Sequence, residues 1–234
     1  LVEDGSTLQL GIGTIPDAVL KFLSDKKDLG IHSEMFSDGV VDLYEKGVIT
    51  GNAKSINKGK MVAAFLMGTD KLYKFVDNNP DVMMLTVDYV NAPFVIAQNH
   101  KMVAINSCLQ VDFNGQVNSE SMGPKQFSGI GGQLDYVRGA AGCPDGKAIL
   151  AMPSTAKHGE ISRIVPVFPE GTTVTTTRAD VHYIVTEYGI ANLRGKSLRE
   201  RAKLLIGIAH PKFRDGLMAA YEARYGKEEE KENG

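Results

Sequence analysis

Glu34 is the residue of this sequence whose surroundings most directly suggest chemistry. It lies in the run GIHSEMFSDG (residues 30–39), where apolar neighbours indicate the end of a buried strand instead of a solvated face. A desolvated carboxylate can attack an activated acyl carbon and form a covalent intermediate. The alternative is a structural glutamate that accepts hydrogen bonds from backbone N–H groups or pairs with a nearby cation. Periodicity alone slightly favours that structural alternative.

Two glycine-rich turns are candidates for a binding role. Gly11-Ile12-Gly13-Thr14-Ile15-Pro16 lies between a predicted strand and a predicted helix, so a ligand can approach its backbone and the helix N-terminus. The run FSGIGGQLD (residues 127–135), which contains Gly131 and Gly132, can turn its N–H groups toward a developing oxyanion. Either turn could instead serve only packing. Leu134 breaks the Gly-x-Gly-x-x-Gly pattern, which argues against dinucleotide binding.

Such turns need a sheet that brings them to one edge, because ligands of open α/β sheets bind beyond the carboxyl ends of strands. Apolar runs alternate with segments of helical period, which predicts an α/β fold with an open mixed, largely parallel, Rossmann-related sheet flanked by helices. We expect strands at 7–12, 29–35, 61–67, 147–152 and 171–177, and antiparallel hairpins over 82–117. We expect helices from Pro16, over 69–76 and 197–209, and from Pro211.

Length and composition narrow the class of protein. A chain of 234 residues with 43% hydrophobic content predicts one domain over 1–226, followed by a charged tail at 227–234 that we expect to be disordered. The 26 basic and 28 acidic residues give no broad attraction to nucleic acid or anionic membranes. No apolar run approaches the roughly 20 residues of a membrane span, and no signal peptide is evident, which predicts a cytoplasmic protein. Leu1 in place of a methionine predicts further chain upstream.

Neither the cysteines nor the histidines predict a metal site. Cys108 and Cys143 are the only cysteines and lack the spacing of metal ligands, so neither a disulfide framework nor a zinc site is indicated. The five histidines show no paired spacing. Lys157 and Arg163 are set aside as well, because single cations in loops are usually solvated.

Taken together, the three glycine and glutamate sites closely resemble those of family I CoA-transferases of the acetyl-CoA hydrolase/transferase group, in particular the 4-hydroxybutyrate and butyryl-CoA:acetate enzymes. The resemblance runs from Leu1 to about Gly226 and includes VNAP (90–93), CLQVD (108–112), AMPST (151–155) and IVTEYG (184–189). It implies the CoA-transferase form of the fold, and that this chain is the C-terminal catalytic half of a longer polypeptide. Ala92 departs from the family, where His often precedes the proline, so the shape of the acyl pocket stays open.

The resemblance also implies roles for single residues. Glu34 matches the nucleophilic glutamate, Glu187 an accessory glutamate beside the active site, and Asn91 a polar residue on the substrate side. Positions that contact CoA in the family are matched here by Gly11, Ile12, Gly13, Thr14, Ile15, Gly131 and Gly132, with Leu109 beside the pantetheine.

The reaction implied is transfer of CoA from a short-chain acyl-CoA, such as 4-hydroxybutyryl-CoA or butyryl-CoA, to a carboxylate such as acetate. It would proceed by ping-pong chemistry through a glutamyl-CoA thioester on Glu34, with no cofactor beyond CoA as substrate. The expected partners are acyl-CoA, short-chain carboxylates and a missing N-terminal half, and a homo-oligomer remains open. The alternatives are an acyl-CoA hydrolase on the same scaffold and a non-catalytic CoA-binding module.

Overall fold

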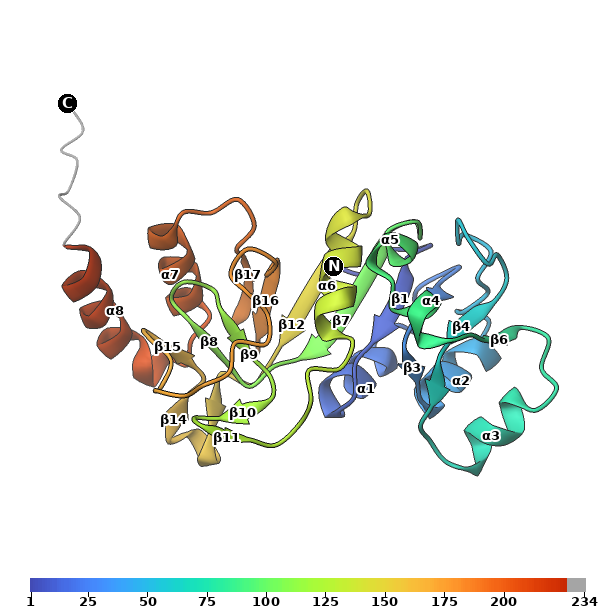
Figure 1. The fold of residues 1–234 in the computed structure, drawn as a ribbon, viewed down its shortest axis with the longest axis horizontal. Helices are drawn as coiled ribbons and strands as arrows, with labels where there is room; N and C mark the ends of the chain where they lie inside the picture. Colours follow the sequence, from blue (N-terminus) through green and yellow to red (C-terminus); the bar gives the residue numbers. More distant parts are fainter. Residues whose placement is uncertain (227–234) are drawn as a thin grey trace. The chain divides into compact units, whose positions relative to one another are not determined.

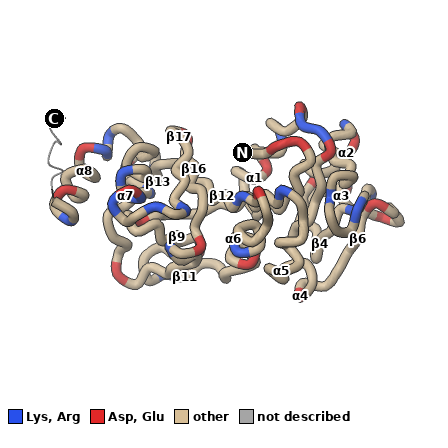
Figure 2. Tube along the Cα trace, turned by 90° about the horizontal axis from the view of Figure 1, so that it is seen from above, with Lys and Arg blue, Asp and Glu red and all other residues tan. Residues whose placement is uncertain are grey.

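The computed structural model describes residues 1–226, and the chain divides into two compact units. The first consists of Leu1–Ser107 and Gly129–Ala151, and the second of Cys108–Ser128 and the chain from Met152 onward (Figure 1). The single domain predicted over 1–226 stays a prediction, and the predicted tail at 227–234 lies outside the described residues. Basic and acidic residues are interspersed along both units (Figure 2), in keeping with the net charge of -2.

The first unit is built on four parallel strands in the order β12-β7-β1-β2. Their bounds are β12 Lys147–Ala151, β7 Met102–Ser107, β1 Thr7–Leu10 and β2 Gly30–Ile31. Every residue of β1 is buried, as both faces of a central parallel strand require. Helix α6 (Gln133–Gly142) packs on β7 and β12, and α1 (Thr14–Lys21) packs on β7. This confirms the predicted largely parallel sheet flanked by helices.

The predicted strand over 29–35 is interrupted, and the interruption contains Glu34. Strand β2 ends at Ile31, and β3 (Met35–Phe36) pairs with a different neighbour, β5 (Phe65–Leu66). Between them His32 forms an isolated bridge with Val62. The chain therefore changes its pairing partner over residues 32–34. Glu34 lies in this irregular segment between two strands and not within a regular strand.

The segment 82–117 was predicted as antiparallel hairpins, and most of that prediction is wrong. Strand β6 (Val82–Met84) pairs in parallel with β4 (Met61–Ala63), and β7 is a central strand of the parallel sheet. Two short helices lie between them, α4 (Val87–Val90) and α5 (Pro93–Ile96). Only the last part is a hairpin, in which β8 (Gln110–Asp112) and β9 (Val117–Asn118) pair antiparallel across the turn at Gly115, whose φ is 84°.

The remaining helices of the first unit are α2 (Asp38–Glu45) and α3 (Asp70–Val76). Helix α3 confirms the helix predicted over 69–76. Thr69 caps α3 by accepting a hydrogen bond from the Lys71 N–H. None of the helices within residues 1–226 combines the length and the apolar character that a membrane-spanning helix needs.

The second unit consists of short strands and two longer helices. Strand β15 pairs with β8, and β16 pairs antiparallel with β17. The predicted strand at 171–177 is wrong, because only Thr176 forms a bridge, with Val117. Ser197 and Glu200 form a capping box at the start of α7. The bounds are β10 Ser121–Met122, β11 Lys125–Gln126, β13 Thr155–Ala156, η1 Lys157–Gly159, β14 Ile161–Ser162, β15 Ile164–Val165, β16 Tyr183–Thr186, β17 Gly189–Asn192, α7 Leu198–Gly207 and α8 Pro211–Tyr225.

Candidate active site

Glu34 is half-buried in the break between β2 and β3, and its backbone is fixed on both sides. Its carbonyl oxygen accepts hydrogen bonds from the N–H groups of Ala64 and Phe65, at 2.9 and 3.0 Å. The preceding Ser33 hydroxyl donates to the Met35 carbonyl at 2.5 Å and accepts from the Leu10 N–H at 3.2 Å. The residue is therefore held on a rigid support, and Ser33 ties it to the carboxyl end of β1.

The Glu34 carboxylate meets Asn91 and Gly132 at one point. A Cβ atom built on Gly132 would lie 2.7 Å from Glu34 Oε2 and 2.6 Å from Asn91 Nδ2. Asn91 is at the corner between α4 and α5, and Gly132 is the residue before α6. The structure thus brings together three of the residues predicted for the site, from segments that are far apart in the sequence.

The start of α6 faces this point. The N–H groups in the first turn of a helix have no acceptor within the helix, and the helix dipole favours negative charge there. Burial and the charge of Glu34 together raise the pKa of the Asp135 carboxyl, which lies in this first turn. The site therefore combines a carboxylate, a side-chain amide and a helix N-terminus. The carboxylate is a group that can attack a carbonyl carbon, and the amide and the helix N–H groups are donors that can stabilise an oxyanion.

The turn at 11–15 follows β1, as predicted. The Gly11 N–H donates to the Ile105 carbonyl at 2.8 Å, and a Cβ atom at Gly11 would lie 2.5 Å from Asn106 Oδ1. Gly13 has a φ of 129°, and the side chain of Ile12 is 59% exposed. Close packing against β7 is thus one reason for the first glycine, while Ile12 and Gly13 remain open to a ligand.

Below this turn, Gln9 and Asn106 exchange two side-chain hydrogen bonds, at 3.0 and 2.9 Å, and both side chains are buried. Each amide therefore satisfies the other, and the ends of β1 and β7 are held in register. Gln133 adds a bond from its Nε2 to the Ser107 carbonyl at 3.2 Å, which connects α6 to the end of β7.

Glu187 belongs to the second unit, in the turn between β16 and β17. Both of its oxygens accept hydrogen bonds from one residue: Ser154 N–H donates to Oε2 at 2.8 Å and Ser154 Oγ to Oε1 at 2.5 Å. Burial acts to raise the pKa of Glu187, but these bonds outweigh it and lower the pKa overall. Ser154 was not a predicted site residue, although it lies in the AMPST motif that carried the resemblance.

Leu109 also belongs to the second unit, where it lines a cavity of about 380 Å³ together with Lys157 and Arg163. Arg163 donates to the Thr155 and Leu109 carbonyls, so its side chain connects two backbone segments at this cavity. Lys157 is exposed, and three successive residues from 157 to 159 have positive φ values of 48°, 54° and 91°. Sequence reasoning set Lys157 aside, and this backbone geometry is not readable from the sequence.

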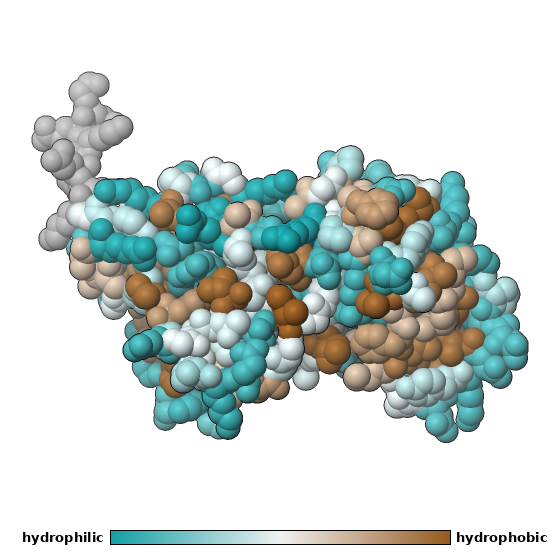
Figure 3. Space-filling view, viewed as in Figure 1, coloured by the Kyte–Doolittle hydropathy of each residue, from teal (hydrophilic) through white to brown (hydrophobic). Residues whose placement is uncertain are grey.

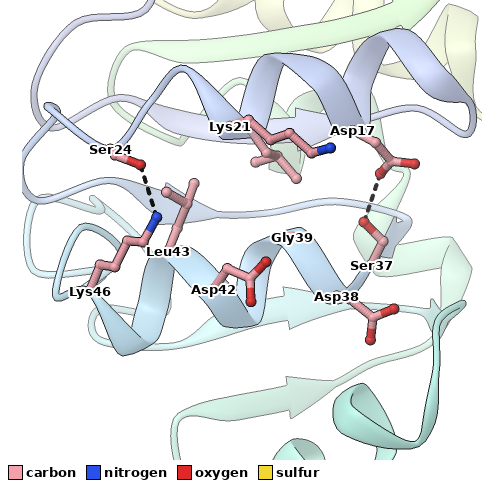
Figure 4. A pocket seen from close by; sticks show the side chains of 10 residues that line it. Asp17, Lys21, Ser24, Ser37, Asp38, Gly39, Asp42, Leu43 and Lys46 are labelled. Atoms are coloured by element: carbon pink, nitrogen blue, oxygen red, sulfur yellow. Dashed lines mark hydrogen bonds between the residues drawn. The ribbon is translucent and has the colours of Figure 1, made fainter.

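A second hollow, of about 310 Å³, lies between α1 and α2 (Figure 4). The Ser37 hydroxyl donates to Asp17 Oδ1 at 2.9 Å, and Lys46 Nζ donates to Ser24 Oγ at 3.2 Å (Figure 4). None of the predicted site residues lines it. We therefore assign the candidate active site to the convergence at Gly132.

Comparison with known proteins defines the class. Residues 68–221 match the family described as acetyl-CoA hydrolase/transferase C-terminal domain. The chain is 60% identical over 225 residues to the 4-hydroxybutyrate coenzyme A transferase of Clostridium kluyveri. The aligned region covers 96% of this chain and 52% of that protein. The chain therefore belongs to the acetyl-CoA hydrolase/transferase family, which confirms the resemblance read from its motifs.

Solved structures agree with this assignment. RipA from Yersinia pestis superposes with a TM-score of 0.91 at 46% identity, over 97% of this chain and 51% of that one. The 4-hydroxybutyrate CoA-transferase from Porphyromonas gingivalis superposes with a TM-score of 0.85 at 48% identity, over 96% and 53%. The chain thus spans about half the length of the relatives that it matches.

Proposed function

We propose that this chain is the catalytic half of an acyl-CoA:carboxylate CoA-transferase in which Glu34 is the nucleophile. The observation that carries the proposal is the convergence of the Glu34 carboxylate, the Asn91 amide and the start of α6 at Gly132. The relatives named as CoA-transferases support it. A non-catalytic CoA-binding module would have no need of a half-buried carboxylate aimed at a helix N-terminus.

In the proposed reaction, a carboxylate oxygen of Glu34 attacks the thioester carbonyl of the acyl-CoA. The new C–O bond forms, the C–S bond breaks and CoA leaves as a thiolate, which gives an acyl-glutamyl anhydride. The thiolate then attacks the glutamyl carbonyl and releases the first carboxylate, leaving a glutamyl-CoA thioester. An acceptor such as acetate reverses these steps. The first-turn N–H groups of α6 and Asn91 Nδ2 would stabilise the oxyanions.

The substrates proposed are a short-chain acyl-CoA, such as 4-hydroxybutyryl-CoA or butyryl-CoA, and a short carboxylate. The turn at 11–15 and Gly131 would contact CoA, Leu109 would lie beside the pantetheine, and Glu187 would serve as the accessory carboxylate. Contacts far from the reacting carbon can offset strain at that carbon, so truncated thiols should react poorly. CoA enters as a substrate, and the steps above need no other cofactor.

A partner segment is also part of the proposal. Large apolar side chains are exposed on the first unit in or beside β5, β6 and the two short helices: Phe65, Met67, Met84, Val87 and Phe94. Figure 3 shows hydrophobic surface on this part of the first unit. Apolar surface of this kind marks an interaction site. Because the chain spans about half of its relatives, we propose that an N-terminal half of the same polypeptide covers surface of this kind and completes the active site.

The test is to detect the covalent intermediate. The polypeptide extended by its N-terminal half is incubated with butyryl-CoA alone, digested and analysed by mass spectrometry. We expect CoA on the peptide that contains Glu34, and neither the adduct nor turnover in Glu34→Gln. Glu45→Gln, which removes an exposed carboxylate at the end of α2, is the matched control and should behave as wild type. Turnover that survives Glu34→Gln would refute the assignment.

The family description also includes hydrolases, so a hydrolase is the second candidate. There water would resolve the glutamyl thioester in place of a carboxylate. The two are separated by measuring CoA release from butyryl-CoA with and without acetate. A transferase forms acetyl-CoA and releases little free CoA, whereas a hydrolase releases free CoA at the same rate in both assays.

A further inference from the structure

The carbonyl oxygen of Val90 lies at the centre of a buried network behind the candidate site. Val90 is the last residue of α4, and the carbonyl groups at the end of a helix need hydrogen-bond donors from outside the helix. The Tyr136 hydroxyl donates to it at 3.0 Å, and His32 Nε2 lies 2.9 Å from it. Since a carbonyl can only accept, His32 must carry its proton on Nε2.

This one carbonyl connects the three segments that form the site. His32 is two residues before Glu34, Val90 is directly before Asn91, and Tyr136 is one helical turn after Gly132. The Tyr136 N–H donates to the Gly132 carbonyl at 3.1 Å. Each residue of the network therefore lies next to one of the three groups that converge, and the network fixes their separation.

Tyr136 also orients the Asn91 side chain. Its hydroxyl has a single proton, which is shared between two acceptors, the Val90 carbonyl at 3.0 Å and Asn91 Oδ1 at 3.3 Å, so the amide oxygen is turned toward Tyr136. The amide nitrogen then faces Gly132 and the Glu34 carboxylate, where the built Cβ position lies 2.6 Å from Nδ2. Without this hydroxyl the planar amide could rotate by half a turn and present its oxygen to the Glu34 carboxylate, which would repel it.

The network is costly, which argues that it does more than stabilise the fold. His32, Val90 and Tyr136 are all 0% exposed, and His32 Nδ1 has no hydrogen-bond partner among the described residues. A buried polar atom without a partner typically destabilises a protein. Burial lowers the pKa of His32 to about 4 and raises that of Tyr136, so His32 is neutral and both residues keep the proton that they donate.

We infer that Tyr136 and His32 are positioning residues, which hold the Asn91 amide and the Glu34 carboxylate in the geometry that the reaction needs. The inference rests on the proposed function for its catalytic consequence. Its geometric part is independent of the proposed function, because the orientation of the Asn91 side chain can be observed without any turnover.

The first experiment uses the polypeptide extended by its N-terminal half. Tyr136→Phe removes the hydroxyl and keeps the ring. We expect kcat to fall about tenfold, as for loss of one neutral hydrogen bond, while KM for butyryl-CoA stays within about twofold. Tyr221→Phe is the matched control, because Tyr221 is 2% exposed and its hydroxyl has no partner among the described residues. Equal kcat values for Tyr136→Phe and this control would overturn the inference.

The second variant pair tests His32 and guards against misfolding of the first. His32→Gln keeps an N–H donor in place of Nε2, whereas His32→Leu has no donor. We expect kcat of the Gln variant to be at least about threefold above that of the Leu variant, at comparable Tm. Equal kcat values in the two would show that the donor to Val90 is irrelevant, and would remove His32 from the inference.

A double-mutant cycle separates positioning from general stability. If Tyr136 acts through Asn91, Tyr136→Phe should lower kcat in the wild-type background and have no effect in an Asn91→Ala background. Equal effects in both backgrounds would overturn the inference, because a structural role alone does not depend on Asn91.

Crystal structures of wild type and Tyr136→Phe, at a resolution that distinguishes the amide oxygen of Asn91 from its nitrogen, separate failure of this inference from failure of the proposed function. We expect the Asn91 side chain to be rotated or in two conformers in the variant. An unchanged Asn91 overturns the positioning role, whatever the activity. A wild-type protein that transfers no CoA, with Asn91 displaced in the variant, supports the positioning role and refutes the proposed function instead.

Discussion

Gly132 and Glu34 are so close that no side chain fits between them: a Cβ atom at position 132 would lie 2.7 Å from Glu34 Oε2. Gly132 has a φ of -85°, which any residue can adopt, so its backbone conformation does not require glycine. Glycine is required at this position because the space beside the Glu34 carboxylate is too small for a side chain. The glycine therefore keeps the space between the start of α6 and the Glu34 carboxylate, the proposed nucleophile, open to a substrate, and this relationship leads directly to a test.

We predict that Gly132→Ala lowers kcat by roughly a hundredfold, because the new methyl group must displace the Glu34 carboxylate or the Asn91 amide. The change is measured as kcat for CoA transfer from butyryl-CoA to acetate. Gly216→Ala is the matched control: Gly216 lies in α8, a Cβ atom there meets nothing within 4 Å, and the substitution should leave kcat unchanged. A Gly132→Ala enzyme with normal kcat would show that the carboxylate does not work in the position seen here.

We predict that Ser154→Ala moves the acidic limb of the pH–rate profile to higher pH. Glu187 has a pKa below its usual value because Ser154 donates two hydrogen bonds to the carboxylate, in spite of an opposing contribution from burial. Removing the hydroxyl removes one of these bonds, so the Glu187 pKa should rise and the carboxylate should be protonated at a higher pH.

Ser119→Ala is the control for that experiment, since the Ser119 hydroxyl has no hydrogen-bond partner among the described residues. It should leave the profile in place. Identical acidic limbs for Ser154→Ala and Ser119→Ala would mean either that Glu187 takes no part in the reaction or that the backbone N–H alone sets its pKa.

We predict that Lys54 makes stability rise with pH above neutrality. Lys54 is 1% exposed, and its ammonium donates to the Ile31 and Lys60 carbonyls at 2.9 and 2.8 Å. Burial lowers its pKa from 10.5 to about 7. Between these pH values the unfolded chain binds more protons than the folded one, so the free energy of unfolding increases with pH, by at most about 1.4 kcal/mol per unit.

Denaturant unfolding of wild type and Lys54→Met at several pH values between 7 and 10 checks this. Met has a similar length and no charge, so the variant should lose the dependence that comes from Lys54, and the free energy of unfolding of wild type should rise with pH relative to that of the variant. Parallel curves would show that the Lys54 pKa is close to its usual value in the folded state.

Local sequence patterns correctly predicted helices and strands whose formation depends mainly on their own residues. They failed for segments whose structure depends on pairing with a strand far away in the sequence. The break at 32–34 depends on β5 and Val62, about thirty residues away, which no local period contains. The β-branched run at 171–177 has the composition of a strand, yet only Thr176 finds a partner. A strand needs hydrogen bonds to a neighbour, and propensity does not supply the neighbour.

The same reasoning applies to the site. Glu34 stood out because a charged residue among apolar ones is visible in the sequence. His32 and Tyr136 did not, because their shared acceptor is a backbone carbonyl, 58 and 46 residues away respectively. A backbone acceptor leaves no mark on residue type, so the proposed positioning residues become visible only in the folded structure.

The last prediction concerns the dependence of this chain on an N-terminal half. We expect the 234-residue chain alone to transfer CoA at least about a hundredfold more slowly than the polypeptide extended upstream, because the Glu34 carboxylate and the turn at 11–15 would lack the contacts that exclude water and orient CoA. The isolated chain should also self-associate through its exposed apolar side chains, among them Val87 and Phe94, which are 53% and 73% exposed.

Both expectations are checked on the same two proteins, by specific activity with butyryl-CoA and acetate and by light scattering. Phe94→Ser in the isolated chain should reduce its self-association, and Leu1→Ser, a change at another exposed apolar residue, should not. Equal specific activity of the isolated and extended chains would mean that this chain assembles a complete active site by itself. The water exclusion that thioester transfer requires would then have to come from this chain itself or from a second copy of it.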